Sequence, residues 1–158
     1  TLNKMKIIKI ILSLTLVLLV TALRAQVAPI DEKGLAIGGY DVVSYFAGKP
    51  TKGDSNISAK HNNATYQFAT TANREAFKKN PAKYLPEFDG FCAWGVGAKS
   101  TKFPINPETF EIIDGKLYLF FNGPFNGSNF NTLDAWDQDQ DNLLKAAKAN
   151  WPAVKAGN

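Results

Sequence analysis

Two stretches of alternating apolar and polar residues in the middle of the chain predict β-hairpins. In the first stretch, residues 57–61 and 64–69 flank Asn62-Asn63, and both asparagines tolerate the positive φ of a tight turn. Tyr66 and Phe68 fall on one face of the second strand, because successive side chains alternate across a strand. We therefore expect one face of this hairpin to belong to the core.

The second predicted hairpin has the strongest short turn signal in the chain. Residues 111–113 and 116–120 meet at Asp114-Gly115, a pair that accepts the type I′ turn. Two glycine-rich segments are expected to be irregular. Residues 122–131 are predicted to form a loop, and residues 91–97 a turn or short strand, because glycine disfavours helix.

Between the hairpins the pattern changes to a helical period interrupted by proline. Thr71 is a suitable N-cap for a helix that turns Phe77 inward. Asn80 can cap a second turn that has Pro81 at its first position, and Pro86 stops it. This arrangement predicts a helix, a break and a further helical turn.

Two other helices are predicted nearer the ends of the chain. Asp41 can cap a short helix that reaches Phe46, since its carboxylate can accept free amide protons. The last helix carries one apolar stripe, and Pro152 is expected to end it. The stripe consists of Leu133, Trp136, Leu143, Leu144, Ala147 and Trp151.

These elements together predict the α+β class. We expect a small single domain in which two antiparallel β-hairpins and a proline-broken helix share an aromatic core, closed by the C-terminal helix. The chain has one cysteine, so its stability has to come from packing and not from an internal disulfide.

Residues 1–25 have the pattern of a signal peptide. Lysines precede an apolar run from Ile10 to Val20, which is short for a membrane span, and Ala25 supplies a small residue for cleavage. The alternative is an uncleaved anchor, with Arg24 as its flank. Cleavage predicts a secreted or periplasmic domain of residues 26–158 with no remaining membrane attachment.

Charge argues against nucleic acid as a partner. Four of the 18 Lys and Arg residues lie within residues 1–25, and none of the 14 acidic residues does, so the remainder holds 14 charges of each sign. A net charge near zero leaves no excess positive field to attract a phosphate backbone. We expect a small ligand or a protein as the partner.

The segment from Tyr66 to Leu85 resembles the YHS domain family. Members of that family read Tyr-x-Phe-Cys-Ser, then a second Cys, a Phe and Asn-Pro-x-x-Tyr-Leu, and this chain matches the aromatic and Asn-Pro positions. The wider frame resembles the family's secreted branch across nearly all of residues 26–158. That frame consists of Gly39-Tyr40-Asp41, Gly90-Phe91-Cys92-Ala93-Trp94, Asp114-Gly115-Lys116-Leu117-Tyr118-Leu119 and Asn150-Trp151-Pro152.

The resemblance implies a YHS-like fold and an association with metal. The metal-binding members are thought to use the cysteine pair, and in this chain Ala69 and Asn73 stand at those two positions. Thiolates hold soft metals, whereas alanine offers no ligand. If a metal is bound here, copper or another soft metal ion is the expected cofactor.

Cys92 and His61 are the candidate metal ligands, since each is the only residue of its type. Cys92 is also the weak candidate for a catalytic residue, because an odd thiol in an oxidising compartment is buried, paired between chains or reactive. The alternative is that Cys92 is a small buried apolar residue. Tyr40 and Asp41 lie in the first of the motifs that resemble the secreted branch, and Trp94 lies in the same motif as Cys92. The candidate ligand-binding residues are therefore Cys92, His61, Trp94, Tyr40 and Asp41.

Three functions remain open from the sequence. The first is a secreted, non-enzymatic YHS-like binding module. The second is a thiol-dependent redox protein that works through Cys92. The third is a structural or interaction domain without a small ligand.

Overall fold

The computed structural model describes residues 27–157, so the predicted signal peptide of residues 1–25 lies outside the described part of the chain. The described part contains five α-helices, short 3-10 helices and three two-stranded antiparallel sheets, which confirms the predicted α+β class. None of its helices has the length and apolar character needed to cross a membrane.

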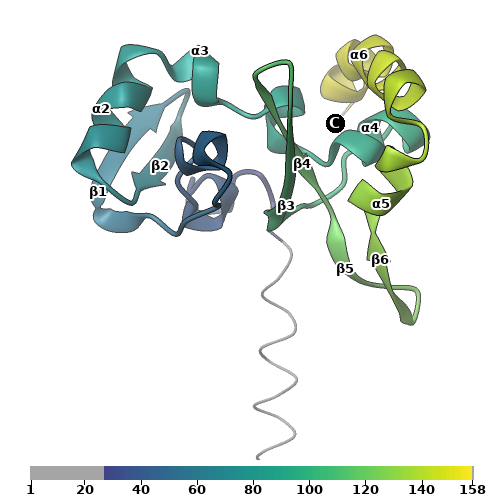
Figure 1. Cartoon of the computed structure of the whole chain (residues 1–158), viewed down its shortest axis with the longest axis horizontal. Coiled ribbons are helices and arrows are strands. Elements are labelled where there is room, and N and C mark those ends of the chain that lie inside the picture. Colours follow the sequence, from purple (N-terminus) through teal and green to yellow (C-terminus); the bar gives the residue numbers. More distant parts are fainter. Residues whose placement is uncertain (1–26, 158) are drawn as a thin grey trace, which may run out of the picture.

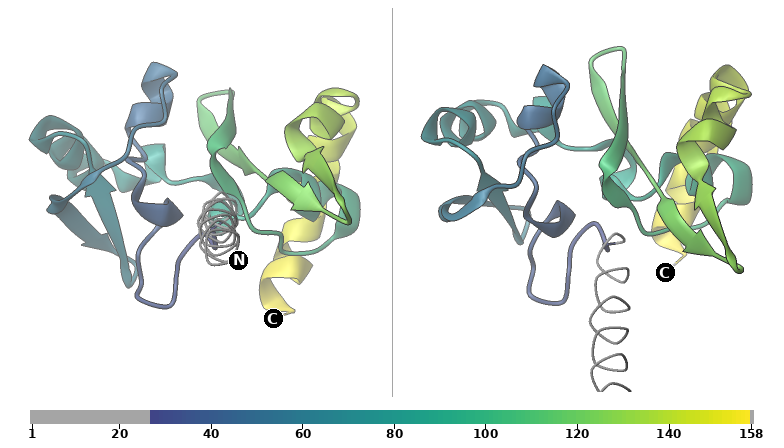
Figure 2. Two further views of the ribbon diagram at one scale, coloured as in Figure 1. Left: turned by 90° about the horizontal axis from the view of Figure 1, so that it is seen from below. Right: turned by 60° about the horizontal axis from the view of Figure 1, so that its bottom comes forward.

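The β3–β4 hairpin stands between two halves of the molecule, and this separation persists in the other views (Figures 1 and 2). In chain order the elements are η1 (Ile37–Gly39), η2 (Ser44–Ala47), β1 (Asp54–His61), β2 (Ala64–Phe68), α2 (Thr71–Lys79), α3 (Pro81–Tyr84), η3 (Glu87–Gly90), α4 (Ala93–Lys99), β3 (Asn106–Ile113), β4 (Lys116–Phe120), β5 (Asn122–Phe125), β6 (Ser128–Asn131), α5 (Thr132–Asp137) and α6 (Gln140–Ala156).

The β1–β2 hairpin forms where the alternation predicts it. Asn62 and Asn63 have φ values of 47° and 64° at the turn, and His61 pairs with Ala64. Tyr66 and Phe68 are buried, as expected for one core-facing side of the strand. The hairpin and its inward face are therefore confirmed.

Helix α2 covers this hairpin and is capped one residue earlier than predicted. The N-cap is Thr70, whose Oγ1 accepts the Asn73 N–H at 3.1 Å, and Thr71 is the first helical residue. Phe77 packs its ring on Tyr66, with the centroids 4.9 Å apart. Pro81 begins α3 as predicted, although the Asn80 side chain forms no capping hydrogen bond.

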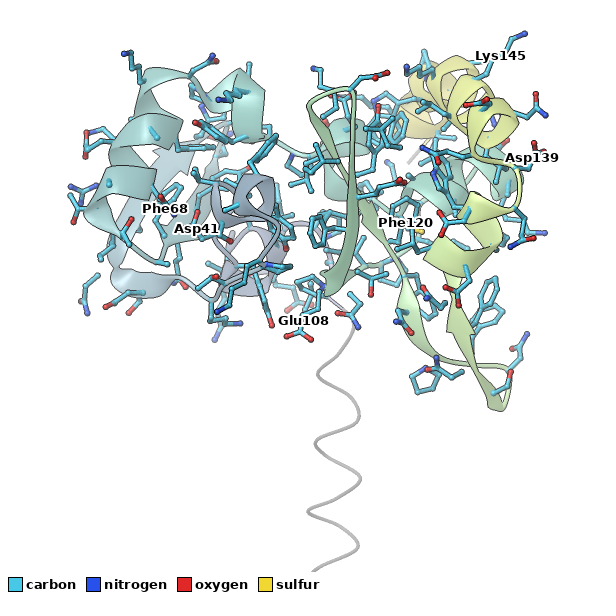
Figure 3. All side chains as sticks on the ribbon, viewed as in Figure 1. Asp41, Phe68, Glu108, Phe120, Asp139 and Lys145 are labelled. Atoms are coloured by element: carbon cyan, nitrogen blue, oxygen red, sulfur yellow. The ribbon has the colours of Figure 1, made fainter. Side chains whose placement is uncertain are left out.

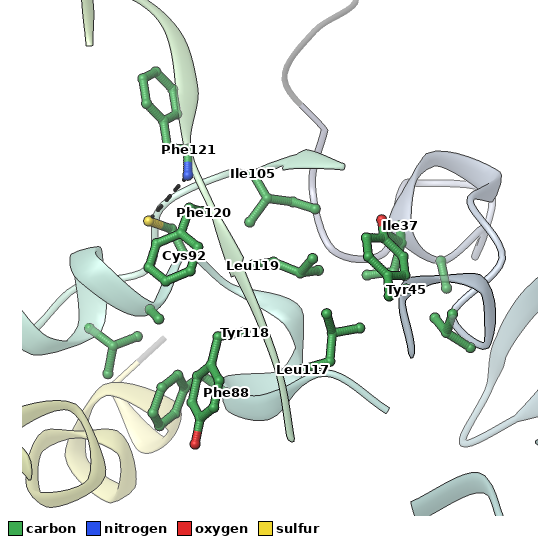
Figure 4. Packing of buried hydrophobic residues seen from close by; sticks show 14 of the residues in the cluster. Ile37, Tyr45, Phe88, Cys92, Ile105, Leu117, Tyr118, Leu119, Phe120 and Phe121 are labelled. Atoms are coloured by element: carbon green, nitrogen blue, oxygen red, sulfur yellow. Dashed lines mark hydrogen bonds between the residues drawn. The ribbon is translucent and has the colours of Figure 1, made fainter. Parts of the chain in front are cut away.

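The β3–β4 hairpin turns at Asp114-Gly115 as predicted, with φ values of 51° and 73°. Its second strand is covered on both faces, because Leu117, Tyr118 and Leu119 are all buried. Figure 4 shows this strand passing through the core with Ile105 beside it and Cys92 close to its end.

The expectation of a turn or short strand at residues 91–97 is wrong, because helix α4 begins at Ala93. The glycines disfavour a helix by propensity, but they let α4 approach its neighbours closely. A Cβ at Gly97 would lie 2.6 Å from the Leu143 carbonyl oxygen of α6, and one at Gly95 would lie 2.9 Å from Phe103 Cβ. Close tertiary packing therefore outweighs the weak helix propensity.

The loop predicted at residues 122–131 is also wrong, because β5 and β6 form a third hairpin there. Its turn is Asn126-Gly127, with φ values of 49° and 83°. This dipeptide is a strong hairpin signal, but the polar residues around it lack a clear alternation. The Asn-Gly turn therefore indicated this hairpin, whereas the residues of its two strands did not.

The single C-terminal helix of the prediction is two helices, α5 and α6. The break falls at Asp139, whose φ of −154° and ψ of 46° are not helical. Pro152 lies inside α6 and does not end it. Val154 is buried beyond the proline, so packing holds the last turn in spite of the missing amide proton.

Replacing Gly97 tests the close contact between α4 and α6. We expect Gly97→Ala to lower the free energy of unfolding by about 2 kcal/mol, because overpacking exceeds the gain in helix propensity. Chemical denaturation measures this. Gly127→Ala is the control: its Cβ meets open space, so only the positive φ costs energy, about 1 kcal/mol. A Gly97→Ala protein as stable as the parent would contradict the packing argument.

Candidate functional site

Cys92 is fully buried at the N-cap position of α4. Its Sγ lies 3.2 Å from Thr132 Oγ1 and accepts the Phe121 N–H at 3.4 Å (Figure 4). The Thr132 hydroxyl already donates to the Phe121 carbonyl at 2.9 Å, so the Cys92 S–H is the donor toward Thr132 Oγ1. In this arrangement Cys92 is a protonated thiol, which donates one hydrogen bond to Thr132 and accepts one from Phe121.

Burial raises the pKa of the Cys92 thiol, and the hydrogen bonds with Thr132 and with nearby backbone groups offset part of that rise. The reactive thiolate is therefore disfavoured, since an apolar environment penalises the charged form. The arrangement matches the description of Cys92 as a small buried residue.

The structure does not bring His61 to Cys92. The His61 ring packs edge-on against Phe77 of α2, with the centroids 5.8 Å apart, whereas Cys92 contacts Thr132 and Phe121 in the other half of the molecule. Across residues 27–157 no three side chains of His, Cys, Asp or Glu gather in a way that could hold a metal ion.

Asp41 is completely buried and accepts three hydrogen bonds. Its Oδ1 accepts the Val43 N–H at 2.9 Å. The predicted capping role is wrong, because η2 begins at Ser44 with Val43 as its N-cap and has no side-chain capping hydrogen bond. Its Oδ2 accepts the Ala69 N–H at 2.9 Å and the Asn73 side-chain amide at 2.7 Å. Figure 3 shows Asp41 close to Phe68. The carboxylate thus ties together η2, the end of β2 and α2.

Tyr40 and Trp94, the other two candidates, are partly buried and make separate sets of contacts. The Tyr40 hydroxyl donates to Glu108 Oε1 at 2.9 Å, and Lys52 Nζ lies 4.8 Å from the ring centroid. Burial and the Glu108 carboxylate both raise the pKa of Tyr40. Trp94 packs edge-on against Phe130, with the centroids 5.2 Å apart.

A cavity of about 280 Å³ lies elsewhere, between the start of the described chain, the β1–β2 turn, the α3–η3 connection and the end of α6. We call it the Tyr66 cavity. It is lined by Pro29, Ile30, Ile37, Asn62, Tyr66, Leu85, Pro86, Asp89 and Lys155. Gly90 lets the apolar wall close, because a Cβ there would lie 3.1 Å from both Ile37 Cδ1 and Pro29 Cβ.

Tyr66 is the most unusual residue of this cavity. It is only 7% exposed, and its hydroxyl forms no hydrogen bond with any described residue. The hydroxyl is not among the fully enclosed unpaired polar atoms, and Tyr66 lines the cavity. Burial and the negative charge of Asp89 raise the pKa of Tyr66 to about 12. The phenol is therefore neutral and free to donate and accept.

Asp89 reaches the cavity because η3 has an unusual backbone. Phe88 and Asp89 have φ values of 56° and 51°, in the left-handed region that non-glycine residues rarely adopt. Phe88 is held there by ring contacts with Tyr118 and Trp151, at centroid distances of 5.8 and 5.7 Å. Asp89 Oδ2 then meets Lys155 Nζ at 2.8 Å. Packing behind the turn therefore fixes an ion pair at the cavity.

A second cavity, of about 250 Å³, is lined by Ser100, Asn150, Ala153, Val154 and Gly157. Its amide group is already used, because Asn150 Nδ2 donates to the carbonyl oxygens of Val96 and Gly97 at 3.0 and 3.3 Å. The Tyr66 cavity is thus the better candidate, since it combines an unpaired polar group with two charges.

The residues of this cavity were not singled out from the sequence as a ligand site. Tyr66 was predicted only as a core residue, and Asp89 was not among the candidate residues. Lys155 is far from both in the chain and carries no motif. The sequence signal that could have indicated this site is the Asp89-Gly90 turn, which lies between Pro86 and Phe91.

Comparisons with protein-family models, with curated proteins and with solved structures find no match for this chain.

Thiol labelling tests the buried environment of Cys92. We expect an aromatic disulfide reagent at mildly alkaline pH to react with the native protein about 100-fold more slowly than with the unfolded chain, because the thiol is enclosed and its pKa is raised. The rate in concentrated guanidinium chloride is the control. Equal rates in the native and unfolded states would show that Cys92 is accessible and would restore the redox hypothesis.

Amide substitution tests the Asp41 hydrogen bonds. Asp41→Asn places a donor where only donors converge, so we expect the free energy of unfolding to fall by about 2 kcal/mol. Asn73→Ala removes one of the three donors and should cost about 1 kcal/mol. Asp141→Asn, at an exposed position of α6, should change stability by less than about 0.5 kcal/mol. Equal stability of the two Asp→Asn variants would refute the structural role of Asp41.

Proposed function

We propose that this chain is a secreted or periplasmic, non-enzymatic binding module of the YHS-like type, and that its small ligand occupies the Tyr66 cavity. The observation that carries the proposal is the unpaired hydroxyl of Tyr66, in a residue that is 7% exposed at the wall of an apolar cavity. The hydroxyl keeps some accessible surface, so a ligand in the cavity can form a hydrogen bond with it, worth about 0.5–1.5 kcal/mol net.

The backbone beside Tyr66 supports the same site. Left-handed non-glycine residues such as Phe88 cost on the order of 1–3 kcal/mol each, and such strain is concentrated at ligand-binding positions. At this cavity the strain has a visible result, because it turns the Asp89 carboxylate toward Lys155.

The resemblance to the YHS family is compatible with a site away from the family's cysteine positions. Ala69 and Asn73, which stand at those positions, both donate to Asp41. The described side chains there form a closed set of hydrogen bonds, so they favour a structural role. The metal and thiol alternatives have less support, because Cys92 and His61 lie in different halves of the molecule.

The secreted or periplasmic location is part of the proposal and rests on the pattern of residues 1–25. A binding module of this kind would meet its ligand outside the cytoplasm. It would need no cysteine chemistry to do so, because the cavity is lined by a phenol, an amide, an ion pair and apolar side chains.

A titration followed by two-dimensional NMR tests this function. The full chain without residues 1–25 is titrated with a panel of amino acids, short carboxylic acids, amines, monosaccharides, nucleobases and Cu(I) or Zn²⁺ salts. We expect at least one organic class to shift the backbone amides of Asn62, Tyr66 and Asp89 in a saturable manner, because these residues line the cavity.

Blocking the cavity provides the control for that titration. Ile30 is 46% exposed at its edge, so Ile30→Trp should fill the entrance without disturbing the core and should abolish the shifts. Phe125→Trp, at the other large exposed apolar residue, should leave them unchanged. If no organic compound shifts the cavity amides, or if shifts cluster at Cys92 and His61 with a metal salt, the proposed function is wrong.

A further inference from the structure

The charges at the Tyr66 cavity come as an opposite pair. Asp89 and Lys155 have side chains that are 54% and 58% exposed, and they are joined by a contact of 2.8 Å. Such an exposed pair contributes little to stability, so a ligand can open it at small cost. Each partner also keeps unused capacity, since Lys155 Nζ has three donors and Asp89 has a second oxygen.

The apolar part of the cavity lies next to this pair. Pro29, Pro86 and Ile37 are buried, while Ile30 is partly exposed at the edge. This wall can cover a small branched or aromatic group. The Tyr66 hydroxyl can donate to one end of a polar group or accept from the other, because the phenol is neutral at physiological pH.

The volume limits the size of the ligand. About 280 Å³ is slightly below the range of cavities that hold drug-sized molecules, and it corresponds to on the order of ten non-hydrogen atoms when each is given about the volume of a water molecule. A monosaccharide would fill it but would meet an apolar wall. An amino acid with a branched or aromatic side chain fits both size and polarity.

Charge complementarity decides between the remaining classes. A simple carboxylic acid would pair with Lys155 and leave Asp89 without its cation, and an amine would pair with Asp89 and leave Lys155 without its anion. A molecule that carries an ammonium and a carboxylate group on the same carbon atom compensates both.

We propose that the ligand of the Tyr66 cavity is a free α-amino acid with an apolar side chain, bound as a zwitterion. Its carboxylate contacts Lys155 and the Tyr66 hydroxyl, its ammonium group contacts Asp89, and its side chain packs on the wall formed by Pro29, Ile30 and Pro86. This assignment rests on the proposed function, because it names the ligand class of the same cavity.

Isothermal titration calorimetry with L-leucine and three matched analogues tests the assignment. 4-Methylpentanoate lacks the ammonium group, 3-methylbutan-1-amine lacks the carboxylate, and glycine lacks the side chain. We expect L-leucine to bind at least about 10-fold more tightly than each analogue, because each loses one charged or apolar contact.

Two charge variants give a signature that a structural role would not produce. In Lys155→Met the carboxylate loses its charged partner and keeps only the Tyr66 hydroxyl, so the preference for L-leucine over 3-methylbutan-1-amine should fall to a small fraction of its parent value. In Asp89→Asn the ammonium loses its partner, so L-leucine and 4-methylpentanoate should bind equally. Asparagine also tolerates the left-handed φ of position 89, which protects the fold. Lys148→Met and Asp141→Asn, at exposed positions of α6, are the matched controls and should keep the parent preference.

The outcomes separate the two proposals. If an acid, an amine or a sugar binds the cavity as tightly as L-leucine, the zwitterion assignment is wrong while the binding function stands. If the charge variants weaken all four compounds equally, the pair has no role in recognition and the assignment also fails. If nothing in the NMR panel reaches the cavity, both proposals fail together.

Discussion

The burial of strand β4 beyond its first residue is the constraint on which the rest of the structure depends. Leu117, Leu119 and Phe120 have no exposed surface, and Tyr118 and Phe121 have almost none. A strand in a two-stranded sheet can be covered on both faces only when other elements pack on each side. The β1–β2 half and the helical half are therefore held together by one shared strand, and each depends on it for its own core.

The same constraint explains which elements were predictable. Asn62-Asn63 and Asp114-Gly115 specify their turns through local backbone preference, so the two hairpins could be recognised without tertiary information. Helix α4 could not, because Gly95 and Gly97 are explained only by Phe103 and Leu143, which come later in the chain. The β5–β6 hairpin lay between these cases, with a clear turn at Asn126-Gly127 but strands too polar to be recognised.

The candidate site was harder to predict for a related reason. Cys92 and His61 attracted attention because of their side-chain chemistry, yet their environments depend on Thr132 and Phe77, which sequence reasoning cannot bring to them. The burial of the Tyr66 ring was predicted correctly. Whether its hydroxyl has a hydrogen-bond partner depends on which polar groups lie around it in the folded chain. Such an absence becomes visible only after the neighbouring segments have been placed in space.

The Tyr66 cavity joins parts of the chain that are far apart, since Pro29 and Lys155 line it together. A molecule bound there would contact both the first described residues and the end of the last helix, and would hold them together. Dissociation of the molecule would let these two segments separate before strand β4 becomes exposed to solvent. The order in which amide protons exchange with solvent would then depend on the concentration of the small molecule.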